Sequence, residues 1–260
     1  MDSHNPAKLS TLSETLFIPL SVRANETANR SAVIKDQKAV EIMNKANPTG
    51  MITDGGSIST LGILARTTVI DSEIQKLLSG APNAVIINLG AGLDTRISRL
   101  DNGSLRWVDL DFPEVITLRR QYFNENERIK FIEKSALDCT WVQDTVCSKE
   151  DTVILIAEGL LMYFTEAEVQ RLLEWLTPHF SEAHLFFDVV HGFFVNKKIS
   201  STFHWGLDKA CDIEKLNPKV KLIQSWSTGD FFKKRQPLML RLLNFLPSTR
   251  NRSQILHIRL

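Results

Sequence analysis

The stretch VIINLGAGLDTR, residues 85–96, decides the fold of this chain. An apolar run rich in β-branched residues ends in a Gly-x-Gly turn, and an amphipathic segment follows it. The run predicts a buried parallel strand, and Gly90 and Gly92 let backbone approach a ligand without an intervening Cβ atom. Doubly wound sheets bind ligands at the carboxyl ends of such strands, so we expect a nucleotide-type site there.

The turn departs from the dinucleotide fingerprint, because Thr95 stands where G-x-G-x-x-G has its third glycine. A second predicted strand, 105–110, brings in Asp109 and Asp111 about 20 residues beyond the first glycine, where a carboxylate accepts hydrogen bonds from a ribose. The alternative is that both aspartates cap the helix that starts near Pro113. The spacing favours ribose binding by the pair.

Composition is that of an ordinary soluble globular chain, with 260 residues, 43% hydrophobic and 23% charged. A formal charge of +1 predicts neither nucleic acid nor a membrane as a partner. No apolar run is long enough for a membrane span, and the polar residues 1–6 are not typical of a signal peptide, so we expect a cytoplasmic protein. The three cysteines lack Cys-x-x-Cys spacing and suggest neither disulfides nor zinc; they are Cys139, Cys147 and Cys211.

Residues up to about 80 are expected to be helical, with helices over 33–43 and 58–78 and a break at 47–50. Strands and helices then alternate, which predicts an α/β fold with a mostly parallel sheet covered on both faces. The expected strands are 85–89, 105–110, 129–132, 153–157, 184–190, 220–226 and 255–260. The expected helices are 95–100, 113–124, 165–178 and 236–245.

No linker or repeat divides the chain, so we expect one domain, 1–260. Its predicted parts are a helical N-terminal cap (1–80), a cofactor-binding core (81–190), an acceptor-side insertion (191–217) and a final segment of strands and a helix (218–260).

Four motifs occur in the order and spacing of one family: Ala65-Arg-Thr67, Leu89-Gly-Ala-Gly-Leu-Asp-Thr-Arg96, Asp109-Leu-Asp-Phe-Pro113 and Ala157-Glu-Gly-Leu-Leu-Met-Tyr-Phe164. Over roughly residues 15–260 the chain resembles the leucine carboxyl methyltransferase family, and more closely its bacterial branch of polyketide carboxyl O-methyltransferases. The resemblance implies a Rossmann-like class I fold with a seven-stranded sheet, S-adenosylmethionine as methyl donor, S-adenosylhomocysteine as product, and transfer to an oxygen.

The donor has a carboxylate, which a planar guanidinium can bind through two parallel hydrogen bonds. The resemblance assigns this contact to Arg66, with Arg23 as the second basic residue. From the residues alone, Arg66 would instead be an exposed helix arginine in a salt bridge. The resemblance also places Gly90 and Gly92 against the methionine portion and Asp109 with Asp111 at the ribose.

Related enzymes carry an aspartate for the adenine after the third strand, and Ser135 stands at that position here. Asp138, nearby, is more typical of a turn residue or a helix cap. Glu158 follows a wholly apolar strand, and the resemblance places it on the donor side. The alternative for Glu158 is a structural salt bridge to an arginine such as Arg96.

Tyr163 is the candidate for orienting the acceptor, although a core position is nearly as compatible with its neighbour Phe164. A hydroxyl acceptor would require a general base, for which His191 and His204 are the candidates, whereas a carboxylate acceptor requires none. The spacing of Asp188 and His191 has no metal-ligand signature.

The sequence therefore predicts an S-adenosylmethionine-dependent O-methyltransferase that acts on a small-molecule carboxylate or hydroxyl. The alternative is a non-catalytic protein of the same fold that binds an adenosyl ligand, and an NAD-dependent dehydrogenase is disfavoured by Thr95. The oligomeric state does not follow from the residues.

Overall fold

A computed structural model describes residues 6–47, 56–145, 147–148, 150–195 and 202–260. The strands are β1 (Val85–Leu89), β2 (Arg106–Asp111), β3 (Ile129–Glu133), β4 (Val153–Ala157), β5 (His184–Val190), β6 (Lys221–Ser227) and β7 (Ser253–Arg259). The helices are α1 (Pro6–Thr27), α2 (Gln37–Ala46), α3 (Gly56–Gly80), α4 (Arg96–Leu100), α5 (Pro113–Arg119), α6 (Glu166–His179), α7 (Ile213–Leu216), α8 (Leu238–Leu243) and α9 (Pro247–Arg250).

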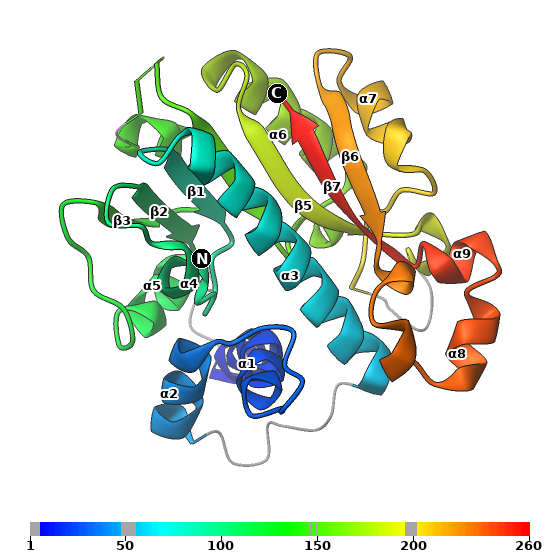
Figure 1. Cartoon of the computed structure of the whole chain (residues 1–260). Coiled ribbons are helices and arrows are strands. Elements are labelled where there is room, and N and C mark those ends of the chain that lie inside the picture. Colours follow the sequence, from blue (N-terminus) through cyan, green and yellow to red (C-terminus); the bar gives the residue numbers. More distant parts are fainter. Residues whose placement is uncertain (1–5, 48–55, 146, 149, 196–201) are drawn as a thin grey trace.

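The strands form one seven-stranded sheet in the order β3-β2-β1-β4-β5-β7-β6 (Figure 1). Neighbours among β1 to β5 pair in parallel, whereas β7 runs antiparallel between β5 and β6. The carboxyl ends of the five parallel strands therefore meet at one edge of the sheet. The order of these strands reverses beside β1, which is where an open α/β sheet offers a crevice for a ligand.

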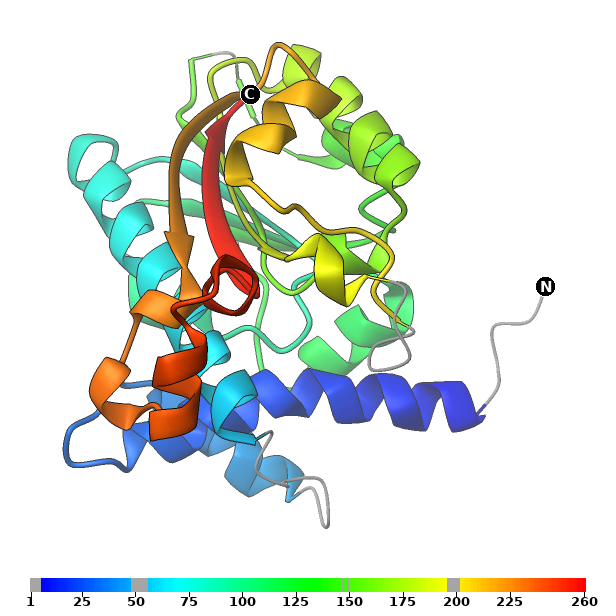
Figure 2. The same cartoon turned by 90° about the vertical axis from the view of Figure 1, so that its right-hand side faces the viewer.

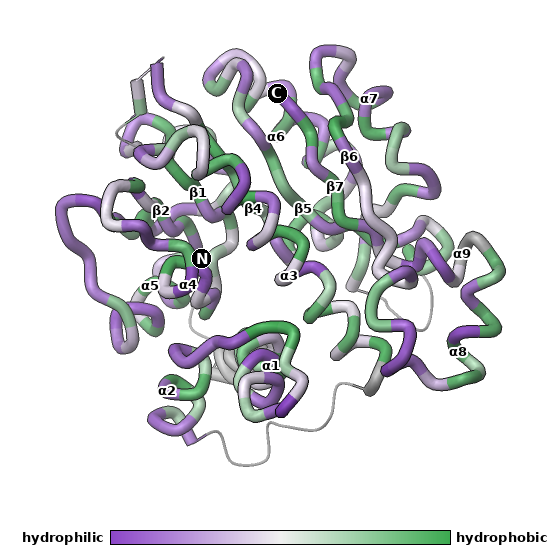
Figure 3. The backbone as a smooth tube through the Cα atoms, in the orientation of Figure 1, coloured by the Kyte–Doolittle hydropathy of each residue, from purple (hydrophilic) through white to green (hydrophobic). Residues whose placement is uncertain are grey.

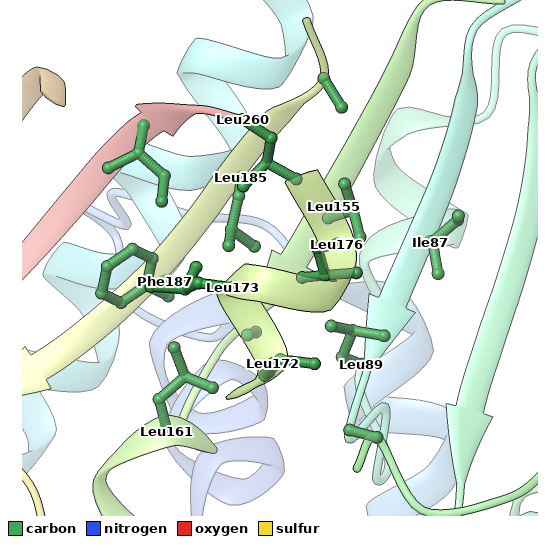
Figure 4. Packing of buried hydrophobic residues seen from close by; sticks show 14 of the residues in the cluster. Ile87, Leu89, Leu155, Leu161, Leu172, Leu173, Leu176, Leu185, Phe187 and Leu260 are labelled. Carbon is green, nitrogen blue, oxygen red and sulfur yellow. The ribbon is translucent and has the colours of Figure 1, made fainter. Parts of the chain in front are cut away.

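Alternate strand residues enter two separate cores, because successive side chains of a strand point to opposite faces. Ile87, Leu155 and Phe187 pack with Leu172 and other apolar residues of α6, as Figure 4 shows. Their sequence neighbours, such as Ile86 and Ile154, pack on the other face with residues of α3, α4 and α5. Helices thus cover both faces, which confirms the predicted fold class.

The first two helices lie together at the carboxyl edge of the parallel strands, whereas α3 runs along one face of the sheet (Figures 1 and 2). The prediction that a helix begins at Val33 is wrong. Asp36 is the N-cap of α2, and its carboxylate accepts a hydrogen bond from the Ala39 backbone at 2.9 Å, so the helix starts at Gln37. Asn47 ends α2 in the left-handed region, while residues 48–50 of the predicted break lie outside the described residues.

Two further predicted helices are shorter than expected. The helix predicted to end at Asn124 ends at Arg119, because the next hydrogen bonds tighten into a turn, as from the Gln121 amide to the Leu118 carbonyl. The helix predicted over 236–245 is α8, which follows Pro237 in an extended conformation.

The described part of the predicted insertion at 191–217 consists of irregular segments, short helical turns and α7, and residues 196–201 lie outside the described residues. The three cysteines have free thiols. None of the described helices is long and apolar enough to cross a membrane.

Candidate functional site

A cavity of about 440 Å³ opens at the carboxyl edge of the parallel strands. This volume lies in the range of about 300–1,000 Å³ that is usual for small-molecule sites. Its walls come from α1, from Arg66 of α3, from β1 and the segments that follow β1, β2 and β4, and from one residue of the insertion, Phe203. The cavity therefore lies where the sequence predicts the site, but it is closed on one side by the N-terminal helix.

The Gly-x-Gly turn forms one wall of this cavity, with Gly90 at φ 65° and Gly92 at φ 49°. Both glycines adopt the left-handed region that other residues rarely occupy. A Cβ atom on Gly90 would also lie 2.9 Å from a methyl carbon of Leu160, which is too close for two carbon atoms. The positive φ angles are the reason that the turn requires glycine, since the end of the Leu160 side chain can shift to relieve this contact.

The two aspartates of β2 have different surroundings, although they are two residues apart. Asp111 lines the cavity, and its two oxygens accept hydrogen bonds from the backbone amides of Gly92 and Phe112, each at 2.8 Å. No cation of the described residues forms an ion pair with Asp111, and burial raises the pKa of its carboxyl.

Asp109, by contrast, is completely buried and does not line the cavity. Its carboxylate accepts hydrogen bonds from Arg119 Nε at 2.8 Å and from Trp107 Nε1 at 2.8 Å. The amide of Asn88 adds a third hydrogen bond at 3.2 Å. The structure therefore separates the predicted ribose pair, and Asp109 acts as the partner of a buried arginine. Neither aspartate is the N-cap of α5, which is Phe112.

Arg66 reaches the cavity from α3 and is fixed by two carboxylates. Its Nε donates to Glu158 Oε1 at 2.8 Å, and its Nη1 donates to Asp188 Oδ2 at 3.0 Å. Asp188 also accepts a hydrogen bond from the Gly159 amide at 2.6 Å, which fixes the turn after β4. The third nitrogen, Nη2, forms no hydrogen bond within the described part of the chain and lies 3.3 Å from the position of a Cβ on Gly159.

Arg23 reaches the same cavity from α1 and is almost wholly buried. Its Nε donates to Asp36 at 2.9 Å and its Nη2 to the Leu93 carbonyl at 3.4 Å. Nη1 of Arg23 forms no hydrogen bond among the described residues. Two guanidinium groups, Arg23 and Arg66, therefore each keep one N–H-bearing nitrogen for a ligand in the cavity.

A buried network of ion pairs surrounds these two arginines. Arg96 donates to Asp71, Asp94 and Glu158, so both oxygens of Glu158 are bound by arginines. Thr95, at the position of the missing third glycine, is buried and hydrogen-bonded to Asp36. The salt bridge to Arg96 that we considered as an alternative for Glu158 is present, and Glu158 also lines the cavity.

The network keeps its carboxylates ionised. Burial by itself would raise the pKa of Asp94, but the arginines around it, Arg96 first, lower that pKa far below its usual range. The pKa of Glu158 is likewise lowered, since Arg96 and Arg66 outweigh the effect of burial. The cavity thus contains fixed positive and negative groups whose charge does not depend on a ligand.

The opposite wall of the cavity is apolar and aromatic. Tyr163 is about half exposed, lines the cavity, and packs edge-on against Phe203 with ring centroids 5.5 Å apart. Burial raises the pKa of its hydroxyl, which is therefore a hydrogen-bond donor at neutral pH. Phe112 and Met162 extend this wall.

Several predicted candidates lie elsewhere. Ser135 does not line the cavity, and its hydroxyl accepts a hydrogen bond from the Leu137 amide at 3.2 Å. Asp138 caps a short 3₁₀-helix through the Thr140 amide, as the sequence predicted. His191, which accepts a hydrogen bond from the Phe193 amide, and His204 are also absent from the cavity wall. Among the described residues no cluster of side chains is arranged to bind a metal ion.

Sequence reasoning missed most of the charged network, because its members are distant in sequence. Asp36 and Asp71 come from the N-terminal helices and Asp188 from the end of β5. The motif at 89–96 did contain one signal, since Asp94 and Arg96 both follow the glycines directly. The cavity can bind a small zwitterionic or cationic molecule at its charged end and an apolar molecule at its aromatic end.

Comparisons with known proteins show which enzymes this chain resembles. The sequence profile of the leucine carboxyl methyltransferase family matches residues 18–177. The chain is 26% identical over 232 residues to the tetracenomycin polyketide synthesis O-methyltransferase TcmP of Streptomyces glaucescens, which covers 86% of this chain and 85% of that protein. It is 27% identical over 242 residues to the S-adenosyl-L-methionine-dependent methyltransferase dpfgK of Gibberella zeae, with 82% and 81% covered.

Solved structures with this fold include a SAM-dependent methyltransferase from Anabaena variabilis, with a TM-score of 0.52, 12% identity, and 86% of this chain and 92% of that chain covered. The magnesium protoporphyrin IX methyltransferase ChlM of Synechocystis, solved with bound SAM, has a TM-score of 0.50 at 13% identity, with 87% and 98% covered. At these identities the likeness shows the fold alone, that of the class I methyltransferases.

Proposed function

Since the chain belongs to the leucine carboxyl methyltransferase family and is an S-adenosylmethionine-dependent methyltransferase, we propose that it methylates a carboxylate oxygen of a small, largely apolar molecule. The relative from Streptomyces glaucescens is named an O-methyltransferase, which supports oxygen as the acceptor atom. The choice of a carboxylate rests on the residues that line the cavity.

The observation that carries the proposal is the composition of the cavity wall. None of its described residues is a histidine, lysine or cysteine, so it offers no usual base for an alcohol or a phenol. Of the three carboxylates in the wall, Glu158 and Asp94 are ion-paired with arginines. The third, Asp111, accepts hydrogen bonds from two backbone amides and is the one that we assign to the ribose. A carboxylate acceptor is ionised at neutral pH and needs no base.

The donor end fits the functional groups of S-adenosylmethionine. We assign the donor carboxylate to the free nitrogens of Arg23 and Arg66, which three carboxylates and a backbone carbonyl hold in place. The backbone at Gly90 and Gly92 lies where the methionine portion would pass. Glu158 holds Arg66 at the donor end of the cavity, so its contribution to donor binding is partly indirect.

Asp111 is the residue that we assign to the ribose. Its oxygens keep lone pairs for two hydroxyl donors, and a neutral diol suits a carboxylate that forms no ion pair with the described residues. Asp109 is not proposed as a ribose ligand, because it faces Arg119 inside the protein. The position of Ser135 outside the cavity wall gives no support to the adenine contact expected from the sequence.

Bound S-adenosylmethionine supplies an electrophilic methyl group, and the protein has to align the acceptor and exclude water. The aromatic wall of Tyr163, Phe203 and Phe112 excludes water from an apolar acceptor. Tyr163 donates its hydroxyl proton in a hydrogen bond to the acceptor carboxylate, and thereby presents the second oxygen.

The test uses matched acceptors that differ only in the reacting group: an aromatic carboxylic acid, the corresponding benzylic alcohol and the corresponding phenol. Each is incubated with the purified enzyme and S-adenosylmethionine, and the product is identified by mass spectrometry. We expect methylation of acids alone, with a product that releases methanol in alkali, as an ester does. Methyl ethers formed from the phenols or alcohols, with the acids unreacted, would contradict the proposal.

A further inference from the structure

The segment 229–252, which we call the α8 corner, combines exposed apolar side chains with an excess of positive charge. Figures 1 and 2 show it at a corner of the molecule, beyond the ends of β6 and β7. Of the twelve large apolar side chains that are exposed among the described residues, six lie in this segment: Leu238, Met239, Leu242, Leu243, Phe245 and Leu246. Such a concentration on a protein surface marks an interaction site.

The backbone that carries these side chains is fixed by hydrogen bonds and one buried side chain. Leu240 of α8 is buried, and the Asn244 side chain donates to the Gly229 carbonyl and to Gln236 Oε1 at 3.2 and 2.9 Å. The Gln236 amide in turn donates to the Gly229 carbonyl at 3.0 Å. Since polar bonds and one apolar anchor fix the segment, the exposure of Met239 (72%) and Phe245 (83%) belongs to its folded form.

Charge distinguishes the α8 corner from the rest of the chain. It contains six basic residues and one acidic residue, whereas the remainder contains 25 basic and 29 acidic residues. Asp230, the acidic residue, pairs with Arg250 at 2.7 Å and with Lys233 at 3.6 Å. Lys234 and Arg241 form no ion pair within the described residues. The overall charge of +1 hides this asymmetry, which is why the sequence predicted no membrane partner.

The basic and apolar groups share one surface. A groove of about 500 Å³ is lined by Leu238, Leu242 and Phe245 together with Lys233, Arg241 and Arg250. In Figure 3 the tube around α8 alternates between hydrophobic and hydrophilic colours. Cations beside exposed leucine and phenylalanine are typical of segments that lie in the interface of an anionic membrane.

We propose that the α8 corner docks the protein on an anionic lipid surface, with its leucine and phenylalanine side chains inserted and its cations on the lipid phosphates. A second copy of the chain fits less well, because a symmetric dimer would bring the two positive corners together. A protein partner is also less suited, since the segment has no tyrosine or tryptophan, the residues that usually anchor protein interfaces.

The test measures co-sedimentation of the full chain with phosphatidylcholine vesicles that contain or lack phosphatidylglycerol. We expect binding to the anionic vesicles, weaker binding at high salt, and little binding to the neutral ones. Charge reversal at Lys234→Glu with Arg241→Glu should lower the partition coefficient at least 25-fold, because each cation near an anionic surface contributes about fivefold. Leu242→Ser with Phe245→Ser should lower it at least tenfold.

Two matched controls lie elsewhere on the surface: Lys130→Glu on β3 and Ile223→Ser on β6, both at exposed positions. They should bind vesicles like the wild type, and all variants should keep S-adenosylhomocysteine binding in a thermal-shift assay. Absence of binding to anionic vesicles, or equal binding by the α8 variants, would overturn the proposal. So would a dimer in light scattering that Leu242→Ser with Phe245→Ser dissolves, since that result would assign the surface to a second copy.

Discussion

The two ends of the cavity are built in opposite ways. At the donor end, Arg23 is buried, Arg66 and Glu158 are partly buried, and all three are held by carboxylates or guanidinium groups from other elements. At the aromatic end, Tyr163 and Phe112 are about half exposed, and the contact described for Tyr163 is a ring contact with Phe203. A donor of fixed structure suits a rigid, charged site, whereas an acceptor wall of exposed rings tolerates change. The difference predicts which substitutions cost stability, donor affinity or acceptor turnover.

The largest effect is expected outside the cavity wall, at the fully buried pair of Asp109 and Arg119. Asp109→Asn leaves Arg119 without its anionic partner in a fully buried position, so the free energy of unfolding should fall by about 3–5 kcal/mol. Asp111→Asn, the matched change two residues away, breaks no ion pair and should leave stability within about 1 kcal/mol. Urea unfolding of both variants makes the comparison. Equal losses of stability would contradict the separation of the two aspartates.

Asp111→Asn, which should have the smaller effect on stability, should have the larger effect on donor binding. Asp111→Asn should weaken S-adenosylhomocysteine binding about tenfold in calorimetry, because an amide has half the acceptor capacity of a carboxylate and no charge. A folded Asp111→Asn protein with unchanged affinity would remove the ribose assignment.

Arg66→Lys tests the shape of the donor end rather than its charge. An ammonium cannot hold Glu158 and Asp188 and also present a free N–H-bearing nitrogen in one plane. We expect donor affinity to fall about ten- to a hundredfold, as for the loss of a charged hydrogen bond. Arg171→Lys, at an exposed position of α6, is the control and should have wild-type affinity. Unchanged affinity in Arg66→Lys would mean that Arg66 serves only to pair with its carboxylates.

The charged network also predicts how stability depends on pH. In the folded protein the pKa values of Asp94 and Glu158 lie below their usual 3.8 and 4.5. Their contribution to stability is therefore present above about pH 4.5 and is lost as the pH falls through the lowered values. Unfolding free energies measured from pH 6 down to pH 3, roughly the acid range in which carboxylates titrate, should decrease more steeply for the wild type than for Glu158→Gln. If the free energies of unfolding of the two proteins depended on pH in the same way, Glu158 would not be one of the titrating groups.

The pKa of Asp111 is shifted in the opposite direction to the pKa values of Asp94 and Glu158. Its pKa is raised by burial, so its share of the stability of the empty protein is greatest at low pH and is lost as the pH rises through the folded value. Relative to the wild type, Asp111→Asn should therefore gain stability between acid and neutral pH. A loss over that interval would show that a cation pairs with Asp111.

The smallest effect is expected at the aromatic end. Tyr163→Phe removes one neutral hydrogen-bond donor and keeps the ring contact with Phe203, so kcat/KM for the acceptor should fall about three- to tenfold. Donor affinity and stability should stay at wild-type values. A change in donor affinity as large as that of Arg66→Lys would contradict the division of the cavity into two ends.

The sequence alone was sufficient for the fold and for the backbone of the site. Seven strands were placed within a few residues, because β-branched apolar runs are distinctive and both sheet faces are buried. The glycine turn was also predictable, since Gly90 and Gly92 adopt positive φ angles that other residues rarely occupy. Helix ends were less predictable, as Asp36 shows, because a single capping carboxylate moved the start of α2 by four residues, from Val33 to Gln37.

Tertiary structure decided which polar residues line the cavity. Asp109 and Asp111 have the same sequence signature, yet one faces Arg119 in the interior and the other faces the cavity. The same holds for Ser135, whose place after β3 does not bring it to the cavity wall. Local patterns record the period of a strand and the conformation of a turn, which depend on neighbouring residues. Ion pairs such as that of Arg66 with Asp188 join residues 122 positions apart, so they exist only after the helices have packed on the sheet.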